Sequence, residues 1–66
     1  MTINQTLDKF LDKYSVNECT FNSDLGYIYS RLKHEKSQYG GNQKFHPSDG
    51  FRRLLEKYLP EIYKAI

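Results

Sequence analysis

The sequence has little of what stabilises many small secreted or membrane proteins. Its one cysteine, Cys19, cannot form a disulfide within the chain, which excludes the disulfide-rich class of small domains. No apolar run approaches the ~20 residues that a membrane-spanning helix needs. The first residues also lack the basic-then-apolar order of a signal peptide. We therefore expect a cytoplasmic protein without a membrane span.

Aromatic residues are plentiful by contrast. The 66 residues include six Tyr and four Phe, each of which can bury roughly 150–250 Å². A chain this short buries only about 60% of the surface that its unfolded form exposes. We therefore expect one domain, residues 1–66, of modest stability.

Charge is unevenly distributed, although the net value is only +2. Residues 1–24 contain two lysines and four acidic side chains, a net charge of −2. Residues 25–53 contain six basic and two acidic side chains, a net charge of +4. A basic centre beside an acidic N-terminal segment bears on binding partners rather than on the fold.

The most regular pattern lies in the C-terminal third. Apolar residues recur there at i, i+3, i+4 and i+7, the period of one helical face: Phe51, Leu54, Leu55, Tyr58, Leu59, Ile62, Tyr63 and Ile66. The pattern predicts a helix over 47–65, with Pro47 in its first position. Pro60 removes one backbone hydrogen bond, so we expect a kink or a break there.

Two further helices are predicted to cover this apolar face. The first spans 3–14, and Thr2 and Gln5 have the spacing of a capping box at its start. Its apolar face consists of Ile3, Leu7, Phe10, Leu11 and Tyr14.

The second predicted helix spans 24–38, with Ser23 as its N-cap and Gly40 and Gly41 as its stop. Its apolar face consists of Leu25, Ile28, Tyr29, Leu32 and Tyr39. A short strand over 20–29 is the alternative, because that stretch contains several β-forming residues. The length of the pattern and its continuation through Leu32 favour the helix.

Residues 15–20 show no period and favour turns. We expect a connection there, with Val16 and Phe21 directed into the core. The predicted fold is a small all-α domain of three helices.

Catalysis finds little support in the residue pattern. A nucleophilic Cys19 would need a histidine, His34 or His46, within hydrogen-bond reach, whereas a lone cysteine is more often a small apolar residue. Cys19, the histidines and Asp49 lack the spacing of metal ligands, and no Lys-Ser/Thr pair follows the two glycines to form a phosphate loop. The core is also too small for a deep pocket of ~300 Å³. We expect no enzyme, no cofactor and no metal ion.

A surface for recognition is better supported. Tyr27, Arg31, His34 and Gln38 are spaced by four, three and four residues, so they form one row on the outward face of the second helix. Tyrosine and arginine are enriched at the centres of protein interfaces; alternatively, Tyr27 covers a neighbouring loop. The loop and the third helix add further candidates: Tyr39, Lys44, Phe45, Arg52 and Arg53.

Two kinds of partner fit such a surface. We expect a small non-enzymatic protein, a monomer or a weak homodimer through Tyr63 and Ile66, that regulates or inhibits a larger protein with an acidic surface. The alternative is a nucleic-acid-binding accessory protein that uses Arg31, Lys33, Lys36, Lys44, Arg52 and Arg53. A pI of about 8.7 is low for a dedicated nucleic-acid binder. The segment from Ser37 to Phe45 is also too long for the turn of a helix-turn-helix.

Overall fold

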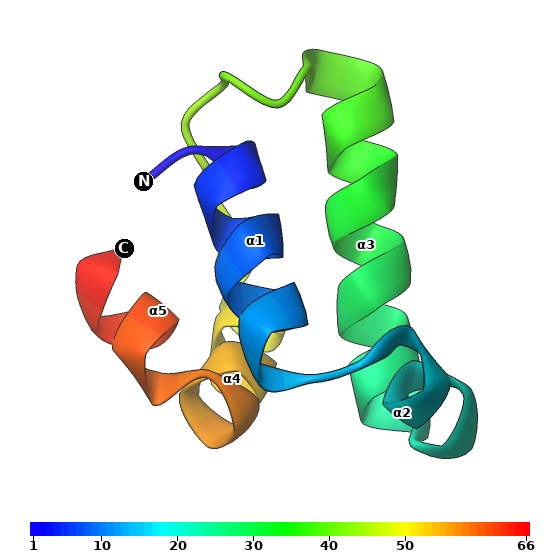
Figure 1. The fold of residues 1–66 in the computed structure, drawn as a ribbon. Coiled ribbons are helices and arrows are strands. Elements are labelled where there is room, and N and C mark those ends of the chain that lie inside the picture. Colours follow the sequence, from blue (N-terminus) through cyan, green and yellow to red (C-terminus); the bar gives the residue numbers. More distant parts are fainter.

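The protein folds as five helices without a strand, as a computed structural model of residues 1–66 describes it. The helices are α1 (Ile3–Lys13), α2 (Val16–Phe21), α3 (Ser23–Tyr39), α4 (Asp49–Tyr58) and α5 (Pro60–Ala65). α1 and α3 lie side by side and run in opposite directions, and α5 lies on the other side of α1 (Figure 1). The prediction of an all-α domain is confirmed, and helix rather than strand follows residue 23.

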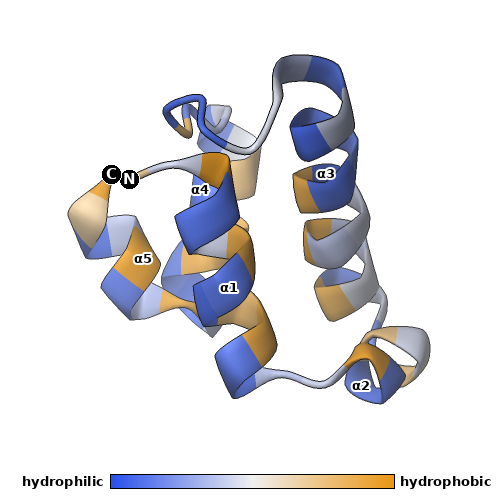
Figure 2. Cartoon of the chain, turned by 45° about the horizontal axis from the view of Figure 1, so that its top comes forward, coloured by the Kyte–Doolittle hydropathy of each residue, from blue (hydrophilic) through white to orange (hydrophobic).

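The core lies where α1, α3, α4 and α5 meet. The apolar sides of α1 and α3 are turned toward the interior (Figure 2). Eleven buried apolar residues form one cluster: Ile3, Leu7, Phe10, Leu25, Ile28, Leu32, Phe45, Phe51, Leu55, Leu59 and Ile62. Leu11, which we expected on the buried face of α1, is exposed.

The C-terminal pattern forms two helices that are separated at Pro60, one of the two predicted outcomes. Pro60 starts α5, where its missing N–H needs no partner, and Leu59 ends α4 by donating its N–H to the Leu55 carbonyl at 2.7 Å. The predicted start is wrong. Ser48 is the N-cap of α4, and its hydroxyl accepts from the Phe51 N–H at 3.4 Å. Because this cap begins the helix at Asp49, Pro47 precedes it.

α2 was not predicted, because six residues are too few to show a helical period. It nevertheless begins with a capping box: the Ser15 hydroxyl accepts from the Glu18 N–H at 3.2 Å, and the Glu18 carboxylate accepts from the Ser15 N–H at 2.8 Å. The inward placement of Val16 and Phe21 is also wrong, since Val16 is 52% exposed and Phe21 is 89% exposed.

α2 and α3 approach each other closely at Gly26. A Cβ atom at this position would lie 2.7 Å from the backbone oxygen of Cys19, so the absence of a side chain permits the approach. Asn22, rather than the predicted Ser23, caps α3, because its side-chain oxygen accepts from the N–H groups of Asp24 and Leu25 at 3.0 and 3.3 Å.

The α3–α4 loop (residues 40–48) is held against the start of α1. Gly40, at φ 86°, ends α3 as predicted. The free N–H groups of Ile3 and Asn4 at the start of α1 donate to the carbonyls of Gln43 and Gly41 at 3.0 and 2.9 Å. The loop thus supplies acceptors that the first turn of a helix lacks. The predicted capping box of Thr2 and Gln5 is present as well.

Two tyrosine hydroxyls connect the C-terminal ends of α1 and α4 to each other and to the N-terminal end of α3. The Tyr14 hydroxyl donates to the Tyr58 backbone oxygen at 2.8 Å, and the Tyr58 hydroxyl donates to the Asp24 carboxylate at 2.7 Å. α1, α3 and α4 are therefore fixed to one another by directed contacts as well as by the core. None of the helices combines the length and apolar character that crossing a membrane requires.

Candidate surface for recognition

The predicted row on α3 lies at the surface. Tyr27, Arg31, His34 and Gln38 are all exposed, because α3 buries its opposite side in the core. Tyr27 contacts a helix rather than a loop: its ring centre lies 6.0 Å from that of Phe51 on α4, yet the residue remains 52% exposed. The contact with Phe51 holds the ring in place, and more than half of the residue stays open to a partner.

The loop residues divide into outward and inward side chains. Tyr39 is 65% exposed, so it does not extend the buried face of α3, and Lys44 is exposed as well. Phe45 is only 2% exposed and its ring packs edge-on against Phe51. Its prediction as a surface residue is wrong. Lys44 pairs with Thr2 in an antiparallel bridge, so the backbone is extended there. Neighbouring residues of an extended segment point to opposite sides, and the exposed Lys44 is therefore followed by the buried Phe45.

The two arginines of α4 lie beside α5. Arg52 is half-buried, with its guanidinium carbon 5.7 Å from the centre of the Tyr63 ring. Arg53 is exposed, and both arginines line a shallow depression with Asp49 and Tyr63. None of the residues of the α3 row lines this depression, although Arg52 also lines a second one together with Lys44 and Phe45.

The structure brings three of the predicted residues together at a cleft between α3 and the α3–α4 loop. The cleft has a volume of about 390 Å³. The cleft is open to solvent, and the α3–α4 loop forms one of its walls. The residues that line it are Ile3, Arg31, Glu35, Tyr39, Gln43, Lys44 and His46.

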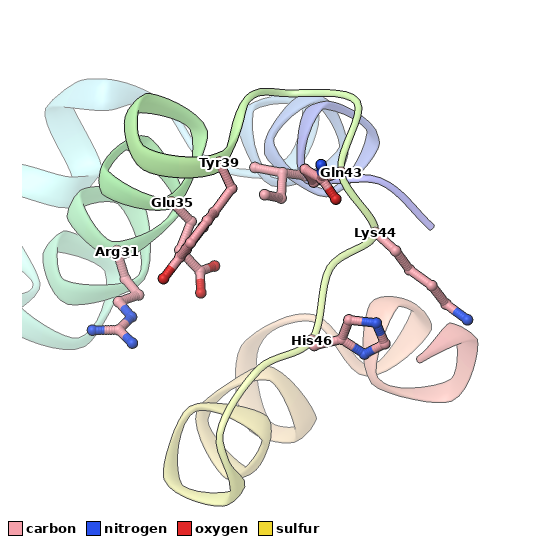
Figure 3. Close-up of a pocket in the computed structure, with 7 residues that line it drawn as sticks. Arg31, Glu35, Tyr39, Gln43, Lys44 and His46 are labelled. Carbon is pink, nitrogen blue, oxygen red and sulfur yellow. The ribbon is translucent and has the colours of Figure 1, made fainter.

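Glu35 and Gln43 are members of this cleft that the sequence did not single out. The Glu35 side chain extends from α3 toward the α3–α4 loop, which carries His46 (Figure 3). The Oε2 atom of Glu35 is buried and has no hydrogen-bond partner, which is uncommon for a buried polar atom. One signal was present in the sequence: Glu35 follows Arg31 and precedes Tyr39 by one helical turn each.

Cys19 has the opposite character to a nucleophile. Burial, and secondarily the negative charge of Glu18, raises the pKa of the Cys19 thiol above its ordinary value. A reactive cysteine instead needs a lowered pKa and a positively charged neighbourhood. No three side chains of the metal-binding types His, Cys, Asp and Glu gather in one place.

Comparison with known proteins does not extend this description. Neither a family model, nor a curated protein, nor a solved structure matches the chain.

Proposed function

We propose that the protein is a small non-enzymatic binding protein that regulates or inhibits a larger protein. Its contact surface is the α3 face, which we define by residues that are all exposed: Tyr27, Arg31, His34, Gln38, Tyr39 and Lys44. The observation that carries the proposal is the exposure of two tyrosines on a helix whose other side fills the core. Tyrosine provides a large contact area at a low cost in conformational entropy, which favours it at interfaces.

Most of the large exposed apolar residues lie on α2 and α3. Val16 and Phe21 on α2, and Tyr27 and Tyr39 on α3, are large and exposed, whereas only Leu11 has this character elsewhere. Exposed apolar surface of this kind, bordered by polar residues, is typical of protein-binding sites. Arg31 and Lys44 add positive charge, so the partner we propose has an acidic surface.

A double substitution tests this proposal. The partner is first captured from the native host by affinity purification and crosslinking, and its affinity is then measured with purified components. Arg31→Glu with Tyr27→Ala should weaken binding by at least about 100-fold, as expected for a central arginine and tyrosine.

The control places the same charge reversal at Arg53, which is exposed on α4 and should leave the affinity unchanged. Because Tyr27 packs against Phe51, circular dichroism must show that the double variant is folded. Full affinity in a folded double variant contradicts the proposal.

Nucleic-acid binding is the second candidate, because the basic residues Arg31, Lys33, Lys36 and Lys44 are all exposed. With roughly four phosphate contacts, the logarithm of the affinity should fall against the logarithm of the salt concentration with a slope near −3 to −4. A gel-shift assay at low salt with double- and single-stranded probes tests this candidate. Absence of any shift there removes it.

A further inference from the structure

A depression of about 210 Å³ lies between the α3–α4 loop, α4 and the end of α5. Three of the side chains that line it are basic, and none is acidic: Lys44, His46 and Arg52. The side chains of Lys44 and His46 extend from the loop to the same side, away from Arg31 (Figure 3). Lys44 and Arg52 therefore bring two positive charges to the depression, His46 adds a hydrogen-bond donor, and no acidic side chain in the lining offsets them.

The rest of the lining is apolar. Phe45 is only 2% exposed and its ring packs edge-on against Phe51, so it provides a fixed apolar surface. Lys44 and His46, on either side of it in the sequence, are exposed. The basic groups therefore border an apolar floor, which consists of Met1, Phe45, Pro47, Ala65 and Ile66.

An apolar floor with a basic border favours one kind of ligand. A phosphate group would gain from the basic side chains, but it has no apolar surface to bury on the floor. A ligand that places an apolar group on the floor and negative charges beside it uses both parts of the lining. The volume of the depression lies below the ~300–1,000 Å³ of sites that enclose a small molecule, so it suits one side chain of a larger ligand.

We propose that the depression receives one apolar side chain, of the size of leucine, from an acidic peptide segment. The carboxylates that flank this side chain face Lys44 and Arg52, and charge complementarity of this kind selects among partners. The segment belongs to the larger protein of the proposed function, so this proposal rests on that function. The two surfaces are continuous, because Lys44 belongs to the α3 face and also lines the depression.

An NMR titration of the full ¹⁵N-labelled chain with N-acetyl-Glu-Leu-Glu-amide tests the proposal. Binding should produce saturable shifts at the amides of Lys44, Phe45, His46, Arg52 and Ala65. Two matched peptides each remove one feature. N-acetyl-Gln-Leu-Gln-amide should bind about tenfold more weakly, because two ion pairs are lost. N-acetyl-Glu-Ala-Glu-amide should also bind about tenfold more weakly, because it buries less apolar surface.

Three results of these titrations would contradict the proposal. Shifts that do not saturate, or that lie outside the depression, show that the acidic peptide does not bind there. Equal affinity of N-acetyl-Glu-Leu-Glu-amide and either matched peptide shows that the charges or the apolar side chain are not recognised. Equal or tighter binding of isocaproate or of a short oligothymidylate shows that the depression takes a small carboxylate or a nucleic acid instead of an acidic peptide.

Two neighbouring arginines provide a matched pair of variants. Arg52→Gln removes a charge from the lining and should weaken the binding of N-acetyl-Glu-Leu-Glu-amide by about fivefold. Arg53→Gln makes the same change at an exposed position outside the depression and should leave the affinity unchanged. Because Arg52 lies beside the Tyr63 ring, thermal unfolding must show that its variant is folded. Lys44→Gln, at an exposed position, should show the same loss and is the second test.

Parental affinity in a folded Arg52→Gln or in Lys44→Gln contradicts the proposal, as does an equal loss in Arg53→Gln. Binding of the protein partner distinguishes this proposal from the proposed function. If Arg31→Glu with Tyr27→Ala weakens partner binding and Arg52→Gln does not, only the role of the depression is contradicted. If the double variant keeps full affinity for the partner while the peptide still binds at the depression, only the role of the α3 face is contradicted.

Discussion

One side of α3 is buried in the core and the other is exposed to solvent, so different physical reasons apply to the residues on each side. The inner side carries Leu25, Ile28 and Leu32, which are almost fully buried in the core. The outer side carries Tyr27, Arg31 and His34, which are exposed. Burial of apolar surface explains the inner residues without further assumptions. It does not account for the exposed parts of the outer residues, and the outer side is where we propose that a partner binds.

The largest expected effect contrasts two neighbours on these opposite sides. Leu32→Ala should lower the free energy of unfolding by about 2–5 kcal/mol, because it leaves a cavity in a core that is fully closed around Leu32. Arg31→Ala should change it by less than about 0.5 kcal/mol. Urea unfolding of both variants measures the difference. Similar losses in the two variants would mean that the outer side also supports the fold.

A second contrast concerns two helical glycines. Gly26→Ala should destabilise the protein by about 1–3 kcal/mol despite the better helix propensity of alanine, because its Cβ would meet the Cys19 backbone oxygen. Gly50→Ala places a Cβ in open space and should stabilise by up to about 1 kcal/mol. Thermal unfolding measures both changes. A stabilising Gly26→Ala would show that α2 does not pack against α3 as described.

A third and smaller effect is expected at the hydroxyl group that joins α4 to α3. Tyr58→Phe removes the 2.7 Å hydrogen bond to the Asp24 carboxylate. The free energy of unfolding should fall by about 1.5 kcal/mol, the lower end of the range for a hydrogen bond to a charged group. Tyr63→Phe is the control, since Tyr63 also packs against the core but its change removes no such link. Chemical denaturation should show a lower free energy of unfolding for Tyr58→Phe than for Tyr63→Phe. Equal values would show that the hydrogen bond does not stabilise the fold.

The smallest effect concerns the chemistry of Cys19. Since burial and Glu18 raise the pKa of its thiol, less of the reactive thiolate is present at a given pH than in an unfolded chain. Alkylation by iodoacetamide should therefore be slower in the folded protein, and its rate should rise at higher pH than in the urea-unfolded protein. A midpoint below that of the unfolded chain would restore Cys19 as a candidate nucleophile.

The parts of the fold that depend on local signals were predictable from the sequence. The capping box of Thr2 and Gln5, the glycine stop at Gly40 and the helix break at Pro60 involve residues a few positions apart. α2 was not predicted because its six residues are too few to show a helical period, and two of its apolar residues, Val16 and Phe21, are exposed. Its capping box, Ser15 with Glu18, was the one available signal.

The candidate site was predictable only where it depends on local spacing along one helix. The row on α3 follows from helical spacing, and the structure places its four residues at the surface. The cleft and the burial of Phe45 instead depend on hydrogen bonds between the α3–α4 loop and the start of α1, such as Ile3 to Gln43. Such pairings between distant residues follow no sequence period.

The most direct test is to map the contact on the protein itself. Once the partner is purified, it is added to the ¹⁵N-labelled chain, and changes in amide resonances and in their intensities are recorded. We expect the changes to concentrate at Tyr27, Arg31, His34, Gln38, Tyr39 and Lys44. Changes confined to α1 and α5, with the α3 face unaffected, would contradict the assignment of that face to partner binding.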